Sequence, residues 1–209
     1  MIDGDLAIRD ALSKAIEATV IEFQKYPLDF LSERDIQALL YAELRKLTPE
    51  LRYSYGANGK NSRFGFKEPF YKEAFYVHPV TTEYYLYNDK RKDRFDVAVL
   101  SSKRDDEAAI WRQPCRVGIE IKFWQPGYGG CRYRADITKL QNYHKYLRGK
   151  EREFTGIAML FVHPNIENEL VSELHGEEVS SAAYPKDGVA LHWVTGWKDG
   201  KHHRWVQPS

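Results

Sequence analysis

The stretch that decides the fold is RVGIEIKFWQPG, residues 116–127. Its apolar residues fall on every second position from Val117 to Phe123, which is the period of a β-strand with one buried face. Glu120 and Lys122 lie between these positions, so their side chains share the opposite face of the same strand. They are either an ordinary solvated ion pair on a sheet or one half of an active site.

The surrounding sequence predicts an α/β protein with a mixed central sheet flanked by helices. Period-two or continuously apolar patterns predict strands at 75–87, 94–100, 115–124, 155–164, 188–195 and 203–207. Helical periodicity predicts helices at 6–26, 32–48 and 134–149, with an acidic helix from residue 165. The second helix has Ser32 and Asp35 placed as a capping box, and residues 53–72 are expected to form a long loop.

These elements predict a single domain spanning residues 1–209. Its core, at about residues 31–164, has the order helix, three strands, helix, strand (αβββαβ). An N-terminal helix within residues 1–26 precedes this core, and a C-terminal helix and strands within residues 165–209 follow it.

The composition is that of a protein outside the membrane. Of 209 residues, 43% are hydrophobic, and no apolar run approaches the roughly 20 residues that a membrane-spanning helix needs. The N-terminus has no basic region followed by an apolar run, so no signal peptide is expected. The two cysteines have neither metal-ligand spacing nor a disulfide framework around them. We therefore expect a cytoplasmic protein with reduced thiols.

The net charge of +1 hides an uneven distribution along the chain. Basic residues gather at 90–94 and 132–150, whereas residues 166–178 carry acids and no Lys or Arg. A molecule with one basic side can bind a polyanion in spite of a small net charge, although the runs can also be ordinary solvated surfaces. The predicted nucleic-acid contacts are Lys90, Arg91, Lys92, Arg94, Arg132, Arg134, Lys145 and Arg148.

Asp96 gives the Glu120–Lys122 pair a chemical meaning. It opens the predicted strand at 94–100, and 24 positions are enough for a strand, a loop and a return strand that brings Asp96 beside Glu120. Two adjacent carboxylates repel each other unless a cation lies between them, and Mg²⁺ favours such oxygen ligands. Lys122 would point to the same ion, where it can assist an attacking water or stabilise charge on a phosphate.

Four segments in this order resemble the PD-(D/E)XK nuclease superfamily, which contains restriction-endonuclease-like and RecB-like nucleases. The segments are SERDIQALLYAEL, RFDVAVL, VGIEIKFW and ADITKLQNYHKYL, and together they span residues 32–147. The resemblance implies a restriction-endonuclease-like core and hydrolysis of phosphodiester bonds, with nucleic acid as substrate and DNA as the favoured kind.

The resemblance also assigns roles to individual residues. Asp96 and Glu120 would bind Mg²⁺ or Mn²⁺, Ile121 would be a third metal-contacting position, and Lys122 would be the catalytic lysine. The carboxylate from the first helix of the core would be Glu33, with Glu43 as the other option, because Glu33 lies in line with the apolar face of that helix. Lys139 and Gln141 are possible contacts to the scissile phosphate.

The chain also departs from the family pattern, and other functions stay open. Phe95 stands where the family name has Pro, and no Tyr follows Gln141 at the fourth position, so the RecB-type signature is incomplete. The first alternative is a protein that keeps the nuclease fold and only binds nucleic acid or another protein. The second is an unrelated α/β domain in which Glu120 and Lys122 are a surface pair. A homodimer is plausible, since cutting both strands of a duplex takes two sites.

Overall fold

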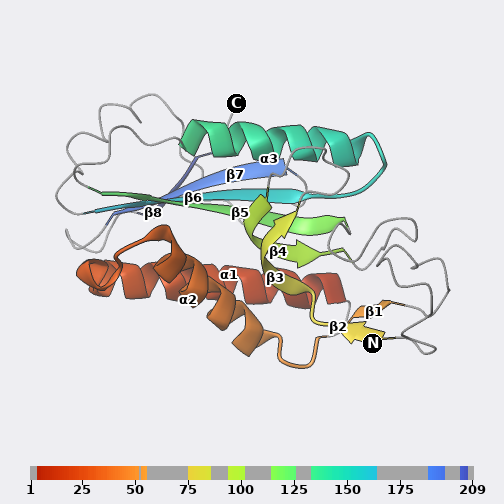
Figure 1. The fold of residues 1–209 in the computed structure, drawn as a ribbon, viewed down its shortest axis with the longest axis horizontal. Helices are drawn as coiled ribbons and strands as arrows, with labels where there is room; N and C mark the ends of the chain where they lie inside the picture. Colours follow the sequence, from red (N-terminus) through yellow and green to blue (C-terminus); the bar gives the residue numbers. More distant parts are fainter. Residues whose placement is uncertain are drawn as a thin grey trace, which may run out of the picture.

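A six-stranded mixed sheet forms the centre of the computed structural model, which describes residues 4–51, 53–55, 75–85, 94–101, 114–125, 133–163, 188–195 and 203–206 (Figure 1). The sheet order is β3-β4-β5-β6-β7-β8. The strands are β3 (Val80–Tyr85), β4 (Arg94–Leu100), β5 (Cys115–Trp124), β6 (Thr155–Val162), β7 (Gly188–Thr195) and β8 (His203–Val206). The pairs β5–β6 and β6–β7 are parallel, and the pairs β3–β4, β4–β5 and β7–β8 are antiparallel.

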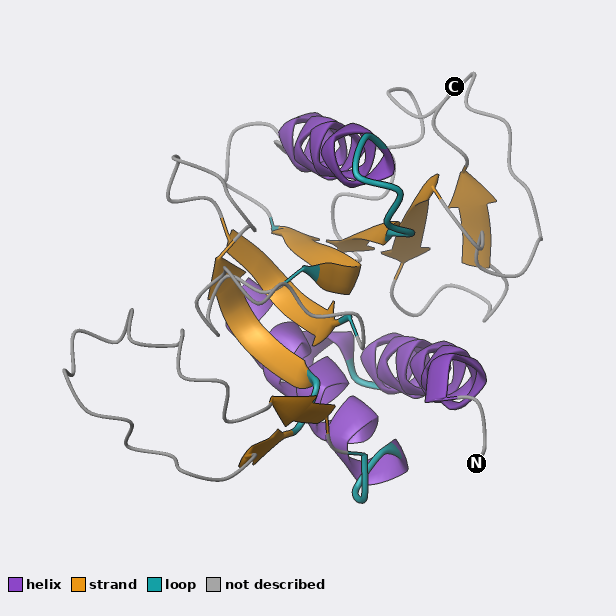
Figure 2. Ribbon diagram, turned by 90° about the vertical axis from the view of Figure 1, so that its right-hand side faces the viewer, coloured by secondary structure: helices purple, strands orange, loops and turns teal. Residues whose placement is uncertain are grey.

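Helices cover both faces of this sheet (Figures 1 and 2). Helices α1 (Gly4–Lys25) and α2 (Glu33–Leu47) lie on one face, joined by the short 3-10 helix η1 (Pro27–Asp29), and α3 (Tyr133–Arg148) lies on the other. Each face has its own apolar core: Phe23, Ile36 and Ile119 are fully buried on the first, and Phe154 and Leu140 on the second. The predicted α/β class with a mixed, helix-flanked sheet is confirmed.

The element order of the core also follows the prediction. Among the elements of the six-stranded sheet and its helices, the chain runs through α2, β3, β4, β5, α3 and β6, which is the expected αβββαβ order; β1 and β2, between α2 and β3, form a separate sheet. All eight residues of β6 are buried, as its continuous apolar run indicated, because β6 lies between β5 and β7 with helices on both faces. No described helix is long and apolar enough to span a lipid bilayer.

The start of α2 is fixed by its own sequence. The Asp35 carboxylate accepts hydrogen bonds from the backbone N–H groups of Ser32 and Leu31, at 2.8 and 2.9 Å. These bonds satisfy donors that a helix start otherwise leaves without partners. The predicted cap therefore sets the residue at which α2 begins, and it places Glu33 in the first turn.

Two parts of the sequence prediction are wrong in detail. The strand expected at 75–87 is divided into β2 (Phe75–Val77) and β3, and β2 pairs with β1 (Tyr53–Tyr55) in a separate two-stranded sheet. The chain changes sheets at His78 and Pro79, where proline has no N–H to give to a ladder and the His78 ring accepts the N–H of Val80 at 3.1 Å. The loop expected from residue 53 thus begins with a strand. The acidic helix predicted from residue 165 lies outside the described residues.

Candidate active site

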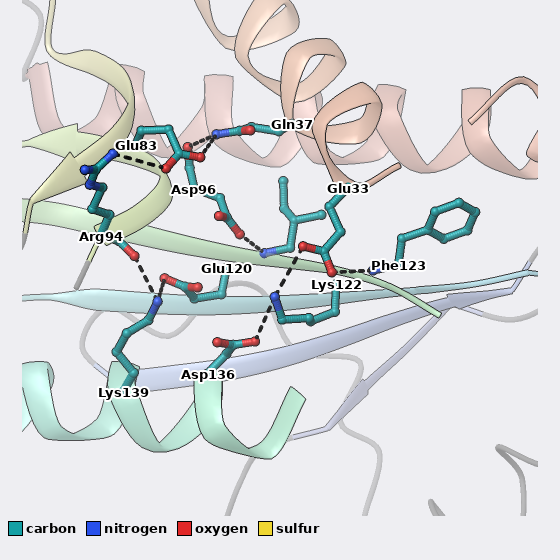
Figure 3. Close-up of polar contacts among 11 residues, drawn as sticks. Glu33, Gln37, Glu83, Arg94, Asp96, Glu120, Lys122, Phe123, Asp136 and Lys139 are labelled. Carbon is teal, nitrogen blue, oxygen red and sulfur yellow. Dashed lines mark hydrogen bonds and ion pairs between the residues drawn. The ribbon is translucent and has the colours of Figure 1, made fainter. Parts of the chain in front are cut away.

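The candidate site lies where the ladder between β4 and β5 ends. The last paired residues are Val97 and Ile119, so Asp96 and Glu120 follow just beyond the ladder. Beyond the ladder, the side chain of Asp96 makes the next hydrogen bond between the two strands: its Oδ2 accepts the N–H of Ile121 at 2.6 Å (Figure 3). The carboxylate of Asp96 is thereby tied to the strand that carries Glu120.

A glutamine on α2 holds the backbone of Asp96. Gln37 donates from Nε2 to the Asp96 carbonyl oxygen at 2.6 Å and to Oε1 of Glu83 at 3.2 Å. Glu83 has a positive φ of 49° in β3, and its Oε2 lies 3.9 Å from the Arg94 guanidinium. Figure 3 shows these side chains gathered on the α2 side of Asp96. The part of β4 that carries Asp96 is therefore held by Gln37 of α2, which is itself in contact with Glu83 of β3.

Glu120 is a buried carboxylate whose partner comes from α3. It is 3% exposed, and its Oε1 lies 2.7 Å from Nζ of Lys139, which also donates to the Arg94 carbonyl at 2.9 Å. The pKa of Glu120 is raised to about 9, first by burial and then by the negative charge of Asp96, while Lys139 offsets part of the effect. Burial also raises the pKa of Asp96 to about 6, against the N–H of Ile121 and the charges of nearby lysines. For both carboxyl groups, the effect of burial exceeds that of the nearby lysines.

Lys122 lies between carboxylates from the two helical layers. Its Nζ is 3.3 Å from Oε2 of Glu33 on α2 and 3.5 Å from Oδ2 of Asp136 on α3 (Figure 3). The other oxygen of Glu33 accepts the N–H of Phe123 at 3.4 Å, which ties Glu33 to β5. Burial lowers the pKa of Lys122, but the charges of Asp136, Glu33 and Asp96 outweigh burial and raise it. Lys122 therefore stays an ammonium at neutral pH.

The structure brings together most of the residues that the sequence singled out. Five of them share the contacts described above: Glu33, Asp96, Glu120, Lys122 and Lys139. Ile121 joins them through its backbone amide, while its side chain is buried on the opposite face of the sheet.

Two of the optional residues do not join this cluster. Glu43 lies near the far end of α2, where its carboxylate pairs with Lys46 at 3.4 Å. Gln141 is half-buried on α3 and makes no polar contact with the cluster in the described part of the chain. Of the two glutamates considered on α2, the structure thus places Glu33 in the cluster, as its position in line with the apolar residues of α2 indicated.

The predicted nucleic-acid contacts are divided between two places and an undescribed part. Arg94 is exposed beside Glu83 at the edge of the cluster. Arg134, Lys145 and Arg148 are exposed on α3, whose opposite side carries the buried residues that face the sheet. These three basic side chains of α3 therefore point away from the sheet. Lys90, Arg91, Lys92 and Arg132 lie outside the described residues.

Three residues of the cluster were not anticipated: Gln37, Glu83 and Asp136. Periodicity contained a signal for two of them. Gln37 lies four residues after Glu33, and Asp136 lies three residues before Lys139, so each shares a helical face with a residue that was singled out. Nothing in the local sequence marks Glu83, because its place beside Gln37 follows from the pairing of β3 with β4.

The carboxyl groups proposed as metal ligands are a pair, Asp96 and Glu120. Within the described ranges, no group of three or more His, Cys, Asp or Glu side chains converges to hold a metal ion. Magnesium keeps several waters and usually takes only one or two protein carboxylates. Asp96 and Glu120 are two adjacent carboxyl groups, and their oxygens are the kind of donor that Mg²⁺ or Mn²⁺ takes.

Comparison of the chain with family models, with curated proteins and with solved structures finds no match. The site must therefore be interpreted from its own geometry and charge.

Proposed function

We propose that the chain is a metal-dependent nuclease that hydrolyses phosphodiester bonds, with DNA as the favoured substrate. One observation carries the proposal: Asp96 and Glu120 lie side by side at the end of a ladder, with Lys122 on the same strand as Glu120. A restriction-endonuclease-like core is part of the proposal. It is supported by the αβββαβ order and by a first-helix carboxylate, Glu33, that reaches the lysine.

Each residue has a role that its surroundings support. Asp96 and Glu120 would hold a divalent ion, which would polarise a phosphate oxygen and lower the pKa of a coordinated water. Lys122 would stabilise negative charge that develops on the phosphate. Its raised pKa favours this electrostatic role over a role as general base, because an ammonium cannot accept a proton. Glu33 orients the ammonium while it is itself held by the N–H of Phe123.

The test is cleavage of supercoiled plasmid and of linear single-stranded DNA in Mg²⁺, Mn²⁺ or EDTA. The parent is expected to cut only with metal, and Lys122→Ala is expected to lower kcat about 100- to 1000-fold, the effect of removing one charge-stabilising donor. Lys46→Ala is the matched control, since Lys46 forms an exposed pair with Glu43. Cutting in EDTA, or a Lys122→Ala variant as fast as the parent, would refute the proposal.

A second candidate is a nuclease fold that binds nucleic acid without cutting it. The observation that favours it is the contact between Lys139 and Glu120 at 2.7 Å, because an internal cation already lies against the carboxyl group that a metal ion would bind. In that case a gel shift would show nucleic-acid binding in EDTA, and adding Mg²⁺ or Mn²⁺ would produce neither cutting nor metal binding at Asp96 and Glu120.

A further inference from the structure

Helix α3 presents opposite charges to the two charged residues of β5. Asp136 faces Lys122 at 3.5 Å, and Lys139 faces Glu120 at 2.7 Å. The two helix residues are three positions apart, so they project from the same side of α3. Figure 3 shows both side chains rising from α3 toward β5. Helix α3 thus places a carboxylate beside the lysine of β5 and a lysine beside the glutamate of β5.

The ammonium of Lys122 lies within ion-pair distance of two carboxylates, which come from different helices. Glu33 contacts it from α2 at 3.3 Å, and Asp136 contacts it from α3 at 3.5 Å. Glu33 is the more open partner, with 43% of its side chain exposed against 15% for Asp136. An enclosed carboxylate needs a cation nearby, because water solvates it poorly. Lys122 is the cation within ion-pair distance of Asp136 in the described part of the chain.

We propose that Asp136 is a positioning residue that keeps the Lys122 ammonium on the α3 side of β5, where Glu120 also lies. Glu33 alone would draw the ammonium toward α2 and away from Glu120. This inference rests on the proposed nuclease function, to which it adds a residue outside the Asp96, Glu120 and Lys122 set.

The catalytic arm of the test compares Asp136→Asn with Asp136→Glu on plasmid DNA in Mg²⁺. Loss of the charge releases the ammonium to Glu33, and misplacement by about 1 Å costs on the order of 100-fold in rate. We expect Asp136→Asn to lower kcat by that factor with little change in KM. Asp136→Glu keeps the charge and should retain kcat to within about tenfold. A kcat for Asp136→Asn equal to that of the parent would overturn the proposal.

The second arm is independent of activity and uses thermal unfolding. Asp136→Asn should lower Tm in the parent, where it breaks the pair with Lys122. In a Lys122→Met background the same substitution should leave Tm unchanged or raise it, because it then removes an unpaired, enclosed carboxylate. The control is Asp10→Asn, which breaks an exposed pair with Lys14 and should shift Tm equally little in both backgrounds. An equal loss of Tm from Asp136→Asn in both backgrounds would overturn the proposal.

The two arms separate the possible failures. If the parent cuts no DNA with any metal, the nuclease proposal fails, and the Tm comparison still decides whether Asp136 holds Lys122. If the parent cuts and the Tm comparison shows no coupling, the nuclease proposal stands and the role of Asp136 is refuted.

Discussion

The two faces of the central sheet differ in what holds their helices. On the α1 and α2 face, the buried cluster consists of apolar side chains. On the α3 face, one end is equally apolar, with Phe95, Tyr143 and Phe154 packed ring against ring, and the other end carries the charged cluster. Glu120 is the only Asp, Glu, Lys or Arg side chain that is fully buried among the described residues.

The two faces therefore differ in the interactions that stabilise them. Apolar packing is spread over many contacts, so the first face is held redundantly. The charged end of the second face depends on a few ion pairs, in which each loss leaves an enclosed charge without a partner. We infer that the first face contributes more to the folding free energy than the charged end of the second face does.

The largest effect should come from the first face. The Phe23 ring is fully buried and contacts Phe30, Phe123 and Phe161, with ring centroids 5.4, 5.7 and 4.9 Å away. Phe23→Ala should lower the free energy of unfolding in urea by about 3–5 kcal/mol. Ile21→Ala, at a position that is 53% exposed, should change it by less than about 0.5 kcal/mol. Similar losses from the two variants would contradict the assignment of this core.

The second prediction concerns pH and the opposite face. The pKa of Glu120, about 9 in the folded chain, lies above its ordinary value, so between pH 6 and 9 the folded state holds a proton that the unfolded chain has lost. Stability must therefore fall as pH rises, by up to about 1.4 kcal/mol per pH unit for one proton. Glu120→Gln removes the titrating carboxyl group, so the stability of the variant should depend less on pH in this range. Urea unfolding of parent and variant across this range checks it, and parallel stability curves would contradict it.

Gly118 lets the apolar part of the second face pack closely. A Cβ added at this position would lie 2.8 Å from atoms of the Phe95 ring, which is held between Tyr143 and Phe154. Gly118→Ala should therefore cost about 1–3 kcal/mol in urea unfolding. Gly149→Ala is the control, because its nearest atoms would lie at an ordinary 3.5 Å. If Gly118→Ala proves no more costly than the control, the face is less tightly packed than described.

The smallest effect should come from the start of α2. Asp35→Ala removes the acceptor of the Ser32 and Leu31 N–H groups and should cost about 1 kcal/mol. Asp10→Ala, in an exposed pair on α1, should cost less than half of that. Thermal unfolding of the two variants provides the comparison, and equal values would mean that the cap does not hold the helix.

Local patterns predicted the elements that local physics controls. Strands β4 and β5 begin and end at the expected residues, because alternation and turn residues mark them directly. The capping box at Ser32 fixed the start of α2 for the same reason. The division at His78 was missed because it depends on the pairing of β2 with β1, whose paired residues lie 20 to 24 positions apart in the sequence.

The site was predictable only in part. Alternation placed Glu120 and Lys122 on one face, and helical register selected Glu33. Helical spacing put Asp136 on the same face of α3 as Lys139, but whether that face meets those charges depends on how the helix docks on the sheet. Tertiary packing made that choice, so it could not be predicted from the sequence.

The most direct test of the central claim is calorimetric titration of Mn²⁺ into the parent, Glu120→Gln and Asp96→Asn. The parent should bind Mn²⁺ and release protons, since the raised pKa values leave protons on the carboxylates that the ion must displace. Both variants should bind at least about tenfold more weakly. Absence of binding to the parent, or equal affinity in all three proteins, would contradict a metal site at Asp96 and Glu120.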